Sequence, residues 1–425
     1  MRIGIEMLGV QSAGRTRGVG RYTRQLVSHL LTRGSPREIV LYFHAGLPGG
    51  EDAWPGRPAV RDLAPAGDGG LASAVARLAA ENPDRLDALL LTCPLEHFRG
   101  YLPPAPRGGR LRLAAIVYDL IPALFPEQYL AHPVIAEAYR RALAAIEQYD
   151  LLLPISAAAR DDCLRRLRTP ADRIVNISAG GDFERFFPRG PAAPSPAAAE
   201  VLRKHGLTEP FVYCMTALDH RKNLDGALAA FALLPESLRQ THRLALTCAM
   251  SSDDDYARLQ QIVAESPAAE RIALTGALDD AALRVMYQHC AAFLFPSRCE
   301  GFGLPILEAL QCGAPVVAGN NSSQIEVVGE AGLLADAESP AEIARQLRRL
   351  LEDAELSRRL REAAPAQARR FRWEQSAERC RAALEQVVAR PAAAGPLRRW
   401  LARGRQAASE RLRRYAVKPP VRRSA

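Results

Sequence analysis

Short apolar runs alternate with helical patterns along most of the chain. Six runs in the first half are short, apolar and often β-branched, which is typical of strands buried on both faces of a parallel sheet. They cover residues 2–8, 38–45, 86–93, 111–121, 149–156 and 173–179. Between them, stretches such as 20–33 and 133–148 place apolar residues at steps of three and four, the period of an amphipathic helix. This alternation predicts an α/β fold.

A second set of apolar runs begins after a stretch rich in Pro, Ala and Ser at 189–200. These runs predict a second parallel sheet, and they cover residues 211–218, 242–250, 271–278, 291–296 and 314–319. The pattern therefore predicts two doubly wound halves joined near residue 190. A chain of 425 residues agrees with this, because it exceeds what one hydrophobic core usually serves.

The composition is that of an ordinary soluble globular protein, with 48% hydrophobic and 24% charged residues. No apolar run approaches the roughly 18 residues that a membrane-spanning helix needs. The start, MRIGIEMLGVQ, lacks the apolar centre of a signal peptide, so we expect a cytoplasmic protein. The eight cysteines form no CxxC pair and have no regular spacing, which indicates reduced core residues.

The net charge of +9 is concentrated at the C-terminal end of the chain. Residues 391–425 hold ten Arg or Lys and one acid, Glu410, which leaves residues 1–390 neutral. Within 397–423, apolar side chains recur at helical spacing among arginines, a pattern that suits a helix lying on an anionic membrane. A disordered basic tail is the alternative. Nucleic-acid binding would rest on this tail alone, so we expect no nucleic-acid partner.

The most restrictive motif is CEGFGLPILEALQCGAPVVAG at 299–319, which places Glu300 and Glu308 around a tight turn. It follows the carboxyl end of the strand predicted at 291–296, where open α/β sheets bind ligands. Carboxylates beside free backbone amides suit a ligand rich in hydroxyl groups, because each carboxylate accepts hydrogen bonds from vicinal OH groups. For either glutamate alone, a solvated or dipole-complementing role is the plainer interpretation.

A helix is predicted to begin at Pro305, which suits a first helical position, and to stop at Gly313. Glu308 is then expected in its first turn, where the helix dipole favours a carboxylate. Gly301 and Gly303 allow backbone N–H groups to approach a ligand closely.

Two cations follow the first strand of the second half. Arg221 and Lys222 lie in TALDHRKNLDGALAAF at 216–231, again at a predicted carboxyl end. Arg offers a planar fork for phosphate oxygens and Lys a point charge, so the pair can stabilise charge growing on a departing diphosphate. A basic helix start open to solvent is the alternative.

A glycine-rich loop follows the first strand, in GVQSAGRTRGVGRYTRQL at 9–26. Gly18 and Gly20 permit a tight turn, and the start of the next helix offers N–H groups to an anion. The loop does not fit G-x-G-x-x-G, so a nicotinamide-type fingerprint is weak.

The string PSRCEGFGLPILEALQCGAPVVAG, followed by EVVGEAGLL at 326–334, resembles the E-x7-E signature of the retaining family-4 glycosyltransferases. The resemblance covers most of residues 1–390 and is strongest at 211–334. It implies the GT-B fold, in which two Rossmann-like domains face each other across a cleft. The expected parts are an acceptor-side domain at 1–190, a nucleotide-sugar-binding domain at 197–372, a helix at 373–390 that packs back towards the first domain, and the basic tail at 391–425.

The resemblance also assigns roles to the motif residues. In that family the second glutamate, here Glu308, binds the ribose hydroxyls of a sugar nucleotide, and the first, Glu300, faces the transferred sugar. Arg221 and Lys222 neutralise the diphosphate, so we expect neither a metal nor any other cofactor. The other donor-side residues that the motif implies are Gly301, Phe302, Gly303 and Leu304.

The first half is implied to hold the acceptor. The loop that contains Gly18 and Gly20 lies near the acceptor in the family, which makes the arginines in and beside it candidates for an acceptor phosphate, unless they are merely solvated; they are Arg15, Arg17 and Arg21. Many relatives carry a His-Asp pair where this chain has Tyr118 and Asp119. Tyrosine is a poor base near neutral pH, so these two are cleft candidates only.

Three further patterns have structural interpretations. SSDDDYARL at 251–259 contains D-x-D, which holds a metal in a different glycosyltransferase fold, but here Ser and Asp fit a helix cap. Asp279 and Asp280 likewise fit a helix start. Ser323 and Glu326 fit a capping box.

The expected function is retaining transfer of a hexose-type sugar of the mannose, glucose or rhamnose class. The donor would be a nucleotide diphosphate sugar and the acceptor a glycan or a lipid-linked glycan, in polysaccharide or lipopolysaccharide assembly, with the tail on the inner face of the cytoplasmic membrane. The alternatives are an inverting GT-B enzyme and a non-catalytic sugar-nucleotide-binding protein tethered by its tail.

Overall fold

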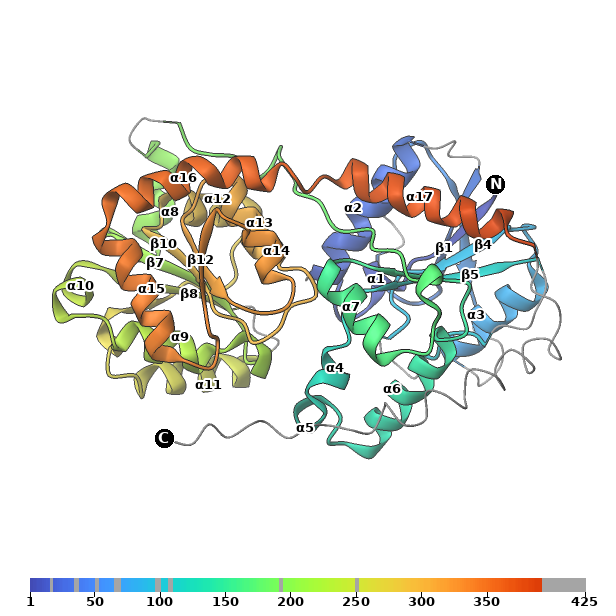
Figure 1. The fold of residues 1–425 in the computed structure, drawn as a ribbon, viewed down its shortest axis with the longest axis horizontal. Helices are drawn as coiled ribbons and strands as arrows, with labels where there is room; N and C mark the ends of the chain where they lie inside the picture. Colours follow the sequence, from blue (N-terminus) through green and yellow to red (C-terminus); the bar gives the residue numbers. More distant parts are fainter. Residues whose placement is uncertain are drawn as a thin grey trace.

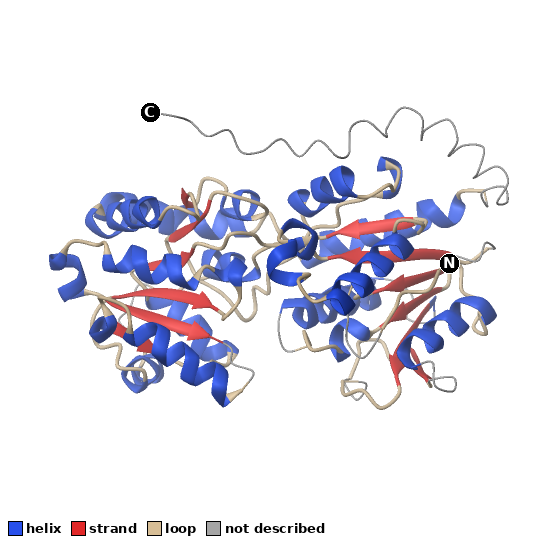
Figure 2. Ribbon diagram, turned by 90° about the horizontal axis from the view of Figure 1, so that it is seen from below, coloured by secondary structure: helices blue, strands red, loops and turns tan. Residues whose placement is uncertain are grey.

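Two lobes lie side by side in the computed structural model (Figure 1), which describes residues 1–15, 18–33, 38–49, 53–64, 70–95, 101–105, 110–190, 194–248 and 252–391. Each lobe contains a six-stranded parallel sheet with helices on both faces (Figure 2). The strand arrows of both sheets point towards the junction between the lobes in Figure 2, so their carboxyl ends face each other. The α/β prediction of two doubly wound halves is confirmed.

The first sheet has the strand order β3-β2-β1-β4-β5-β6. Its strands are β1 (Ile3–Glu6), β2 (Ile39–His44), β3 (Ala59–Leu63), β4 (Ala88–Leu91), β5 (Arg112–Val117) and β6 (Leu151–Pro154). Every residue of these strands except those of β3 is buried, because helices cover both faces. The helices of this lobe are α1 (Leu8–Gln11), α2 (Gly18–Arg33), α3 (Gly70–Glu81), α4 (Ile121–Leu124), α5 (Pro126–Tyr129), α6 (Pro133–Ile146) and α7 (Ala157–Arg166).

The second sheet has the strand order β12-β11-β10-β7-β8-β9. Its strands are β7 (Phe211–Thr216), β8 (Arg243–Cys248), β9 (Ile272–Leu274), β10 (Ala292–Phe295), β11 (Val316–Gly319) and β12 (Gly332–Ala335). The helices are α8 (Pro196–Lys204), α9 (Leu224–Ala232), α10 (Glu236–Thr241), α11 (Asp253–Ala264), α12 (Asp280–His289), α13 (Leu304–Gln311), α14 (Gln324–Val328), α15 (Pro340–Glu352) and α16 (Ala354–Ala368). Tyr213, Tyr287 and Phe293 pack edge to face or tilted under this sheet.

Several helices begin at a Ser or Asp whose side chain accepts an N–H group of the first turn. They include Ser156, Ser195, Ser252, Asp279, Ser339 and Asp353. Ser252 is the helix cap predicted in the SSDDD stretch, and Asp279 caps α12 as predicted. The expected capping box does not form, because the Ser323 hydroxyl makes no cap hydrogen bond and Glu326 contacts the other lobe.

The strand predicted at 173–179 is wrong. This segment runs beside β6, and the Val175 N–H group donates to the Leu152 carbonyl at 3.0 Å, but only one isolated bridge forms. The Asn176 side chain accepts the Ser178 N–H group at 2.8 Å, and Ser178 has a φ of 61°, so a local turn replaces the ladder.

The chain crosses between the lobes twice. At the crossing, the Gly181 N–H group donates to the Phe371 carbonyl at 3.1 Å. A Cβ on Gly180 would lie 2.1 Å from the Trp373 nitrogen, so only glycine fits there. The last described helix, α17 (Trp373–Ala389), then packs against α2, β5 and β6 of the first lobe (Figure 1).

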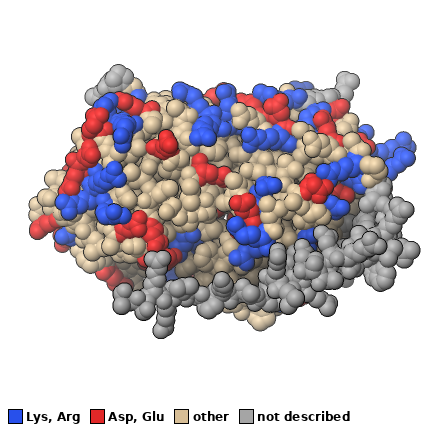
Figure 3. All heavy atoms as spheres, viewed as in Figure 1, with Lys and Arg blue, Asp and Glu red and all other residues tan. Residues whose placement is uncertain are grey.

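No helix in the described part of the chain has the length and apolar character to cross a membrane. The basic segment predicted at 397–423 lies outside the described residues. All eight cysteines are buried free thiols, as expected. Figure 3 shows basic and acidic side chains interspersed over the visible face, which fits the neutral charge of residues 1–390.

Candidate active site

Glu300 is clamped by two cations at the carboxyl edge of the second sheet. Its side chain is 8% exposed, with Arg221 Nη1 2.7 Å from Oε2 and Lys222 Nζ 2.6 Å from Oε1. Burial raises the pKa of Glu300, but the charges of Arg221 and Lys222 outweigh it and hold that pKa below its usual value. Burial also lowers the pKa of Lys222, against the attraction of Glu300. The structure thus brings together the three residues for which the sequence predicted catalytic roles.

The two cations are positioned by a short 3₁₀ turn after β7. The Asp219 side chain caps this turn by accepting the Arg221 N–H group at 3.1 Å. Asn223 ends it in the left-handed region with a φ of 53°. The buried Asn223 amide donates to the Pro296 carbonyl at 2.9 Å and to the Ala337 carbonyl at 2.7 Å. Sequence reasoning missed Asn223, although an Asn directly before a helix was the available signal.

A polar loop after β11 holds the backbone of Glu300. The Glu300 N–H group donates to Ser322 Oγ at 3.0 Å, and Ser323 Oγ donates to the Glu300 carbonyl at 2.9 Å. Gln324 and Asn321 donate to the Ser297 carbonyl at 2.7 and 3.0 Å. Sequence reasoning assigned Ser323 to a capping box and missed the other residues of this loop. The clustered amide and hydroxyl side chains at a predicted carboxyl edge were the only signal.

Glu308 lies in the second turn of α13, so its predicted place in the first turn is wrong. The helix begins at Leu304, one residue before Pro305, and its first turn contains no acidic residue. Gly303 precedes it with a φ of 98°, and Gly313 follows it with a φ of 72°, as its predicted stop. Because Glu308 is removed from the helix start, its partners are side chains rather than the helix dipole.

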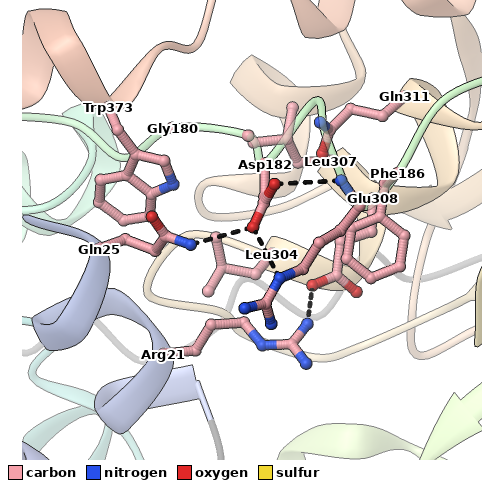
Figure 4. A pocket seen from close by; sticks show the side chains of 12 residues that line it. Arg21, Gln25, Gly180, Asp182, Phe186, Leu304, Leu307, Glu308, Gln311 and Trp373 are labelled. Carbon is pink, nitrogen blue, oxygen red and sulfur yellow. Dashed lines mark hydrogen bonds and ion pairs between the residues drawn. The ribbon is translucent and has the colours of Figure 1, made fainter. Parts of the chain in front are cut away.

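Those partners come from both lobes (Figure 4). Arg21 of α2 forms ion pairs with Glu308 and with Asp280 at the start of α12. The Tyr287 hydroxyl donates to the other Glu308 oxygen at 3.2 Å. Burial raises the pKa of Glu308, and the Arg21 charge opposes this. Arg21 was a candidate for an acceptor phosphate, and the structure places it against the donor-side carboxylate.

The other motif residues fill the junction between the lobes. A Cβ on Gly301 would lie 2.3 Å from the Tyr118 carbonyl, so the Glu300 loop touches the first lobe here. The Phe302 side chain is buried and packs edge to face on Phe371, with ring centroids 5.5 Å apart. Leu304 lines a small cavity together with Arg21 and Glu308 (Figure 4). Gly301, Phe302 and Leu304 thus lie beside the two glutamates.

The glycine-rich loop is closed by Gly20. Its N–H group donates to the Gly14 carbonyl at 3.1 Å, and a Cβ on Gly20 would lie 1.9 Å from the Arg15 carbonyl oxygen. Gly18 begins α2 with open space around it. Arg17 lies outside the described residues.

Tyr118 and Asp119 directly follow β5 at the same junction. The Tyr118 hydroxyl lies 2.7 Å from Thr23 Oγ1, and burial raises its pKa well above the ordinary value. Asp119 accepts the Ile121 N–H group at 2.9 Å, and burial raises its pKa too. A proton on Tyr118 is therefore held tightly, and its hydroxyl acts as a hydrogen-bonding group rather than a base.

No cluster of three or more His, Cys, Asp or Glu side chains in the described residues could hold a metal ion. The Asp residues of the D-x-D stretch lie in the first turn of α11. Metal independence stays a prediction.

Comparison with known proteins places this site in a family. The family model "Glycosyl transferases group 1" matches residues 200–367, which include both glutamates and both cations. Residues 200–367 of this chain thus belong to the group 1 glycosyltransferase family.

Relatives and solved structures agree with the family. The Escherichia coli serotype-specific mannosyltransferase WbdA is 28% identical over 89% of this chain, which spans about half (47%) of that relative's length. The Escherichia coli O-antigen chain mannosyltransferase B is 29% identical over 84% of this chain and 93% of that protein. Sucrose-phosphate synthase of Thermosynechococcus elongatus superposes with a TM-score of 0.70 at 19% identity over 92% of this chain and 99% of that one. The GT-B prediction is confirmed.

Proposed function

We propose that this protein is a retaining hexosyltransferase that uses a nucleotide diphosphate sugar and a glycan or lipid-linked acceptor. The observation that carries the proposal is the Glu300–Arg221–Lys222 cluster, one loop away from Glu308 and facing the first lobe. The cluster supplies two fixed cations and a carboxylate at the edge where an α/β sheet binds ligands.

Each residue has one role in this proposal. Glu308 accepts hydrogen bonds from the ribose hydroxyls, and Glu300 with the amides of Phe302 and Gly303 faces the transferred sugar. Arg221 and Lys222 stabilise the charge that grows on the diphosphate as the bond to the sugar breaks, so no metal is needed. Two fixed cations in a largely water-excluded site are effective for this purpose.

Transfer then occurs on one face of the sugar. The bond between the anomeric carbon and the diphosphate oxygen breaks, and a bond from the acceptor oxygen to the same carbon forms. The acceptor proton passes to the departing diphosphate, so no side-chain base is required. This accounts for Tyr118 at a position where many relatives carry histidine.

The sugar class proposed first is mannose, because both reported relatives are named mannosyltransferases. Glucose and rhamnose are the other classes. Polysaccharide or lipopolysaccharide assembly is the proposed pathway, since one relative is named for the O-antigen chain. The protein would work in the cytoplasm, with its tail on the inner face of the membrane.

A thermal-shift panel with GDP-mannose, UDP-glucose and dTDP-rhamnose tests the donor. A nucleotide sugar that binds only the folded state raises the melting temperature. The bound donor is then incubated with and without glycan acceptors, and the anomeric configuration of the product is read by proton NMR. Retention supports the proposal, and inversion replaces it with the inverting alternative.

A non-catalytic sugar-nucleotide-binding protein is the second candidate, and the partly buried Tyr118 in place of a histidine is the observation that favours it. Slow donor hydrolysis without acceptor distinguishes the two. Hydrolysis above the spontaneous rate that disappears in Arg221→Ala supports an enzyme. Binding without any such hydrolysis or transfer supports the second candidate.

A further inference from the structure

Arg21 carries a direct contact between the first lobe and the donor side of the second. Its guanidinium extends from the first turn of α2 and meets Glu308 through Nη1 (Figure 4) and Asp280 through Nη2. The guanidinium also lies 5.9 Å from the centre of the Phe186 ring. The contact therefore joins two residues that are 287 positions apart in the chain.

Asp280 is itself held in place. Its second oxygen accepts from Arg185 Nη1 at 2.5 Å, and Arg185 also pairs with Asp182 at 3.1 Å. The Gln25 amide, one turn after Arg21 on α2, donates to the same Asp182 oxygen at 3.0 Å. Arg21 thus reaches Glu308 from a fixed helix and is steered by a fixed second carboxylate.

Both oxygens of Glu308 are already engaged by donors. Arg21 occupies Oε1, the Tyr287 hydroxyl occupies Oε2, and the side chain is only 9% exposed. A ribose offers two vicinal hydroxyl groups, which are also donors. Each carboxylate oxygen could accept a second hydrogen bond, but so little of the side chain is exposed that a ribose and the guanidinium compete for access to it, and the cation is the stronger donor of the two.

We propose that Arg21 is a gate on the donor site, which holds the two lobes together over Glu308 and must leave this carboxylate before a nucleotide ribose can bind it. The inference rests on the proposed role of Glu308 as the ribose acceptor. Arg21 is in this sense a positioning residue, because it controls the separation of the lobes and the access to Glu308.

If Arg21 is such a gate, removing its positive charge is expected to raise the affinity of the protein for a nucleotide diphosphate. Isothermal titration of the full chain with GDP and with UDP gives the dissociation constant of whichever diphosphate binds the wild type. Arg21→Met is expected to lower this constant about tenfold, because a charge-assisted competitor is lost while Tyr287 still orients Glu308. Stopped-flow tryptophan fluorescence is expected to show faster association of the nucleotide, because Trp373 lines the same cavity.

Two variants serve as controls. Arg345→Met removes an exposed cation of α15 whose ion pair is with Glu342, and its dissociation constant is expected to equal that of the wild type. Asp280→Asn weakens the hold on Arg21 and is expected to lower the constant by a smaller factor. It also keeps the test informative if Arg21→Met does not fold.

An unchanged or raised dissociation constant in Arg21→Met overturns the gate. If Arg21→Met does not fold, the same result in Asp280→Asn overturns it. Glu308→Gln separates this failure from failure of the proposed function. If Glu308→Gln loses affinity while the gate variants gain none, the ribose role stands and the gate is wrong. If Glu308→Gln binds as tightly as the wild type, the ribose role itself is wrong.

Discussion

Arg221 and Lys222 hold Glu300 in the structure, and both are proposed to meet the leaving diphosphate. The charge they stabilise is largest as the bond to the sugar breaks, so Arg221→Ala and Lys222→Ala are expected to lower kcat about 10²–10³-fold. KM is expected to change much less. Steady-state kinetics with saturating acceptor check this, with the exposed Arg345→Ala as control. An unchanged kcat in both variants would remove them from the mechanism.

Local sequence patterns predicted some of the residues in the candidate site and missed others. Arg221, Lys222 and Glu300 could be predicted, because each follows a strand and the carboxyl ends of parallel strands meet at one edge. The partner of Glu308 could not be predicted, because Arg21 lies in the other lobe and only the packing of the two lobes brings it to Glu308. Glu308 was assigned to the helix dipole for the same reason, since a local pattern offers no other partner.

At the scale of the element, the start of α2 provides a matched pair of glycines. A Cβ on Gly20 would overlap the Arg15 carbonyl oxygen, whereas a Cβ on Gly18 would meet nothing within 4 Å. Gly20→Ala is expected to lower the free energy of unfolding by about 1–3 kcal/mol through overpacking. Gly18→Ala is expected to be neutral or to stabilise by about 0.5–1 kcal/mol, since Ala is the better helix former. Urea unfolding compares them, and equal effects would contradict the close approach at Gly20.

The strands divide into those that the apolar pattern revealed and those that it did not. Central strands such as β1 and β10 are buried on both faces and therefore read as continuous apolar runs. Sequence reasoning missed β3 and β12, which lie at sheet edges: β3 exposes its three central residues, and the first three residues of β12 are only partly buried. An edge strand can be short or polar, so its sequence carries little signal.

At the scale of the whole molecule, Glu326 forms another contact between the lobes, and this contact is expected to depend on pH. Both oxygens accept the Ala157 N–H group at the start of α7, at 3.0 and 3.2 Å. Burial, together with the nearby Asp161 charge, raises the pKa of Glu326 to about 7 from 4.5. An acid whose pKa is raised in the folded state binds its proton more tightly there than in the unfolded state. Its contribution to stability is therefore fully present below about pH 4.5 and is lost as the pH rises through 7.

Glu326→Gln removes this titration while keeping an acceptor oxygen for the Ala157 N–H group. Relative to the wild type, the variant is expected to be more stable at pH 8 than at pH 5, by roughly 1–3 kcal/mol after allowance for solvent screening. Thermal unfolding at the two pH values measures the difference. The same difference at both would show that Glu326 titrates near its ordinary pKa.

The basic segment at 391–425 is proposed to bring the protein to an anionic membrane. Arg390 pairs with Asp172 at 2.9 Å, and its carbonyl accepts from Arg112 at 2.5 Å, so a chain that ends at Pro391 keeps every described contact of α17. That truncated protein is expected to fold and to bind donor.

The full chain is expected to co-sediment with vesicles of anionic lipid at low salt, because each cation near the surface adds about 1 kcal/mol. Salt is expected to release the protein, because screening weakens the attraction between its cations and the lipid. The apolar side chains within 397–423 are too few to hold the protein on the membrane by insertion alone. The chain that ends at Pro391 should stay in the supernatant under the same conditions. Equal sedimentation of the two would place the membrane contact elsewhere, whereas loss of donor binding on truncation would make the tail part of the folded enzyme.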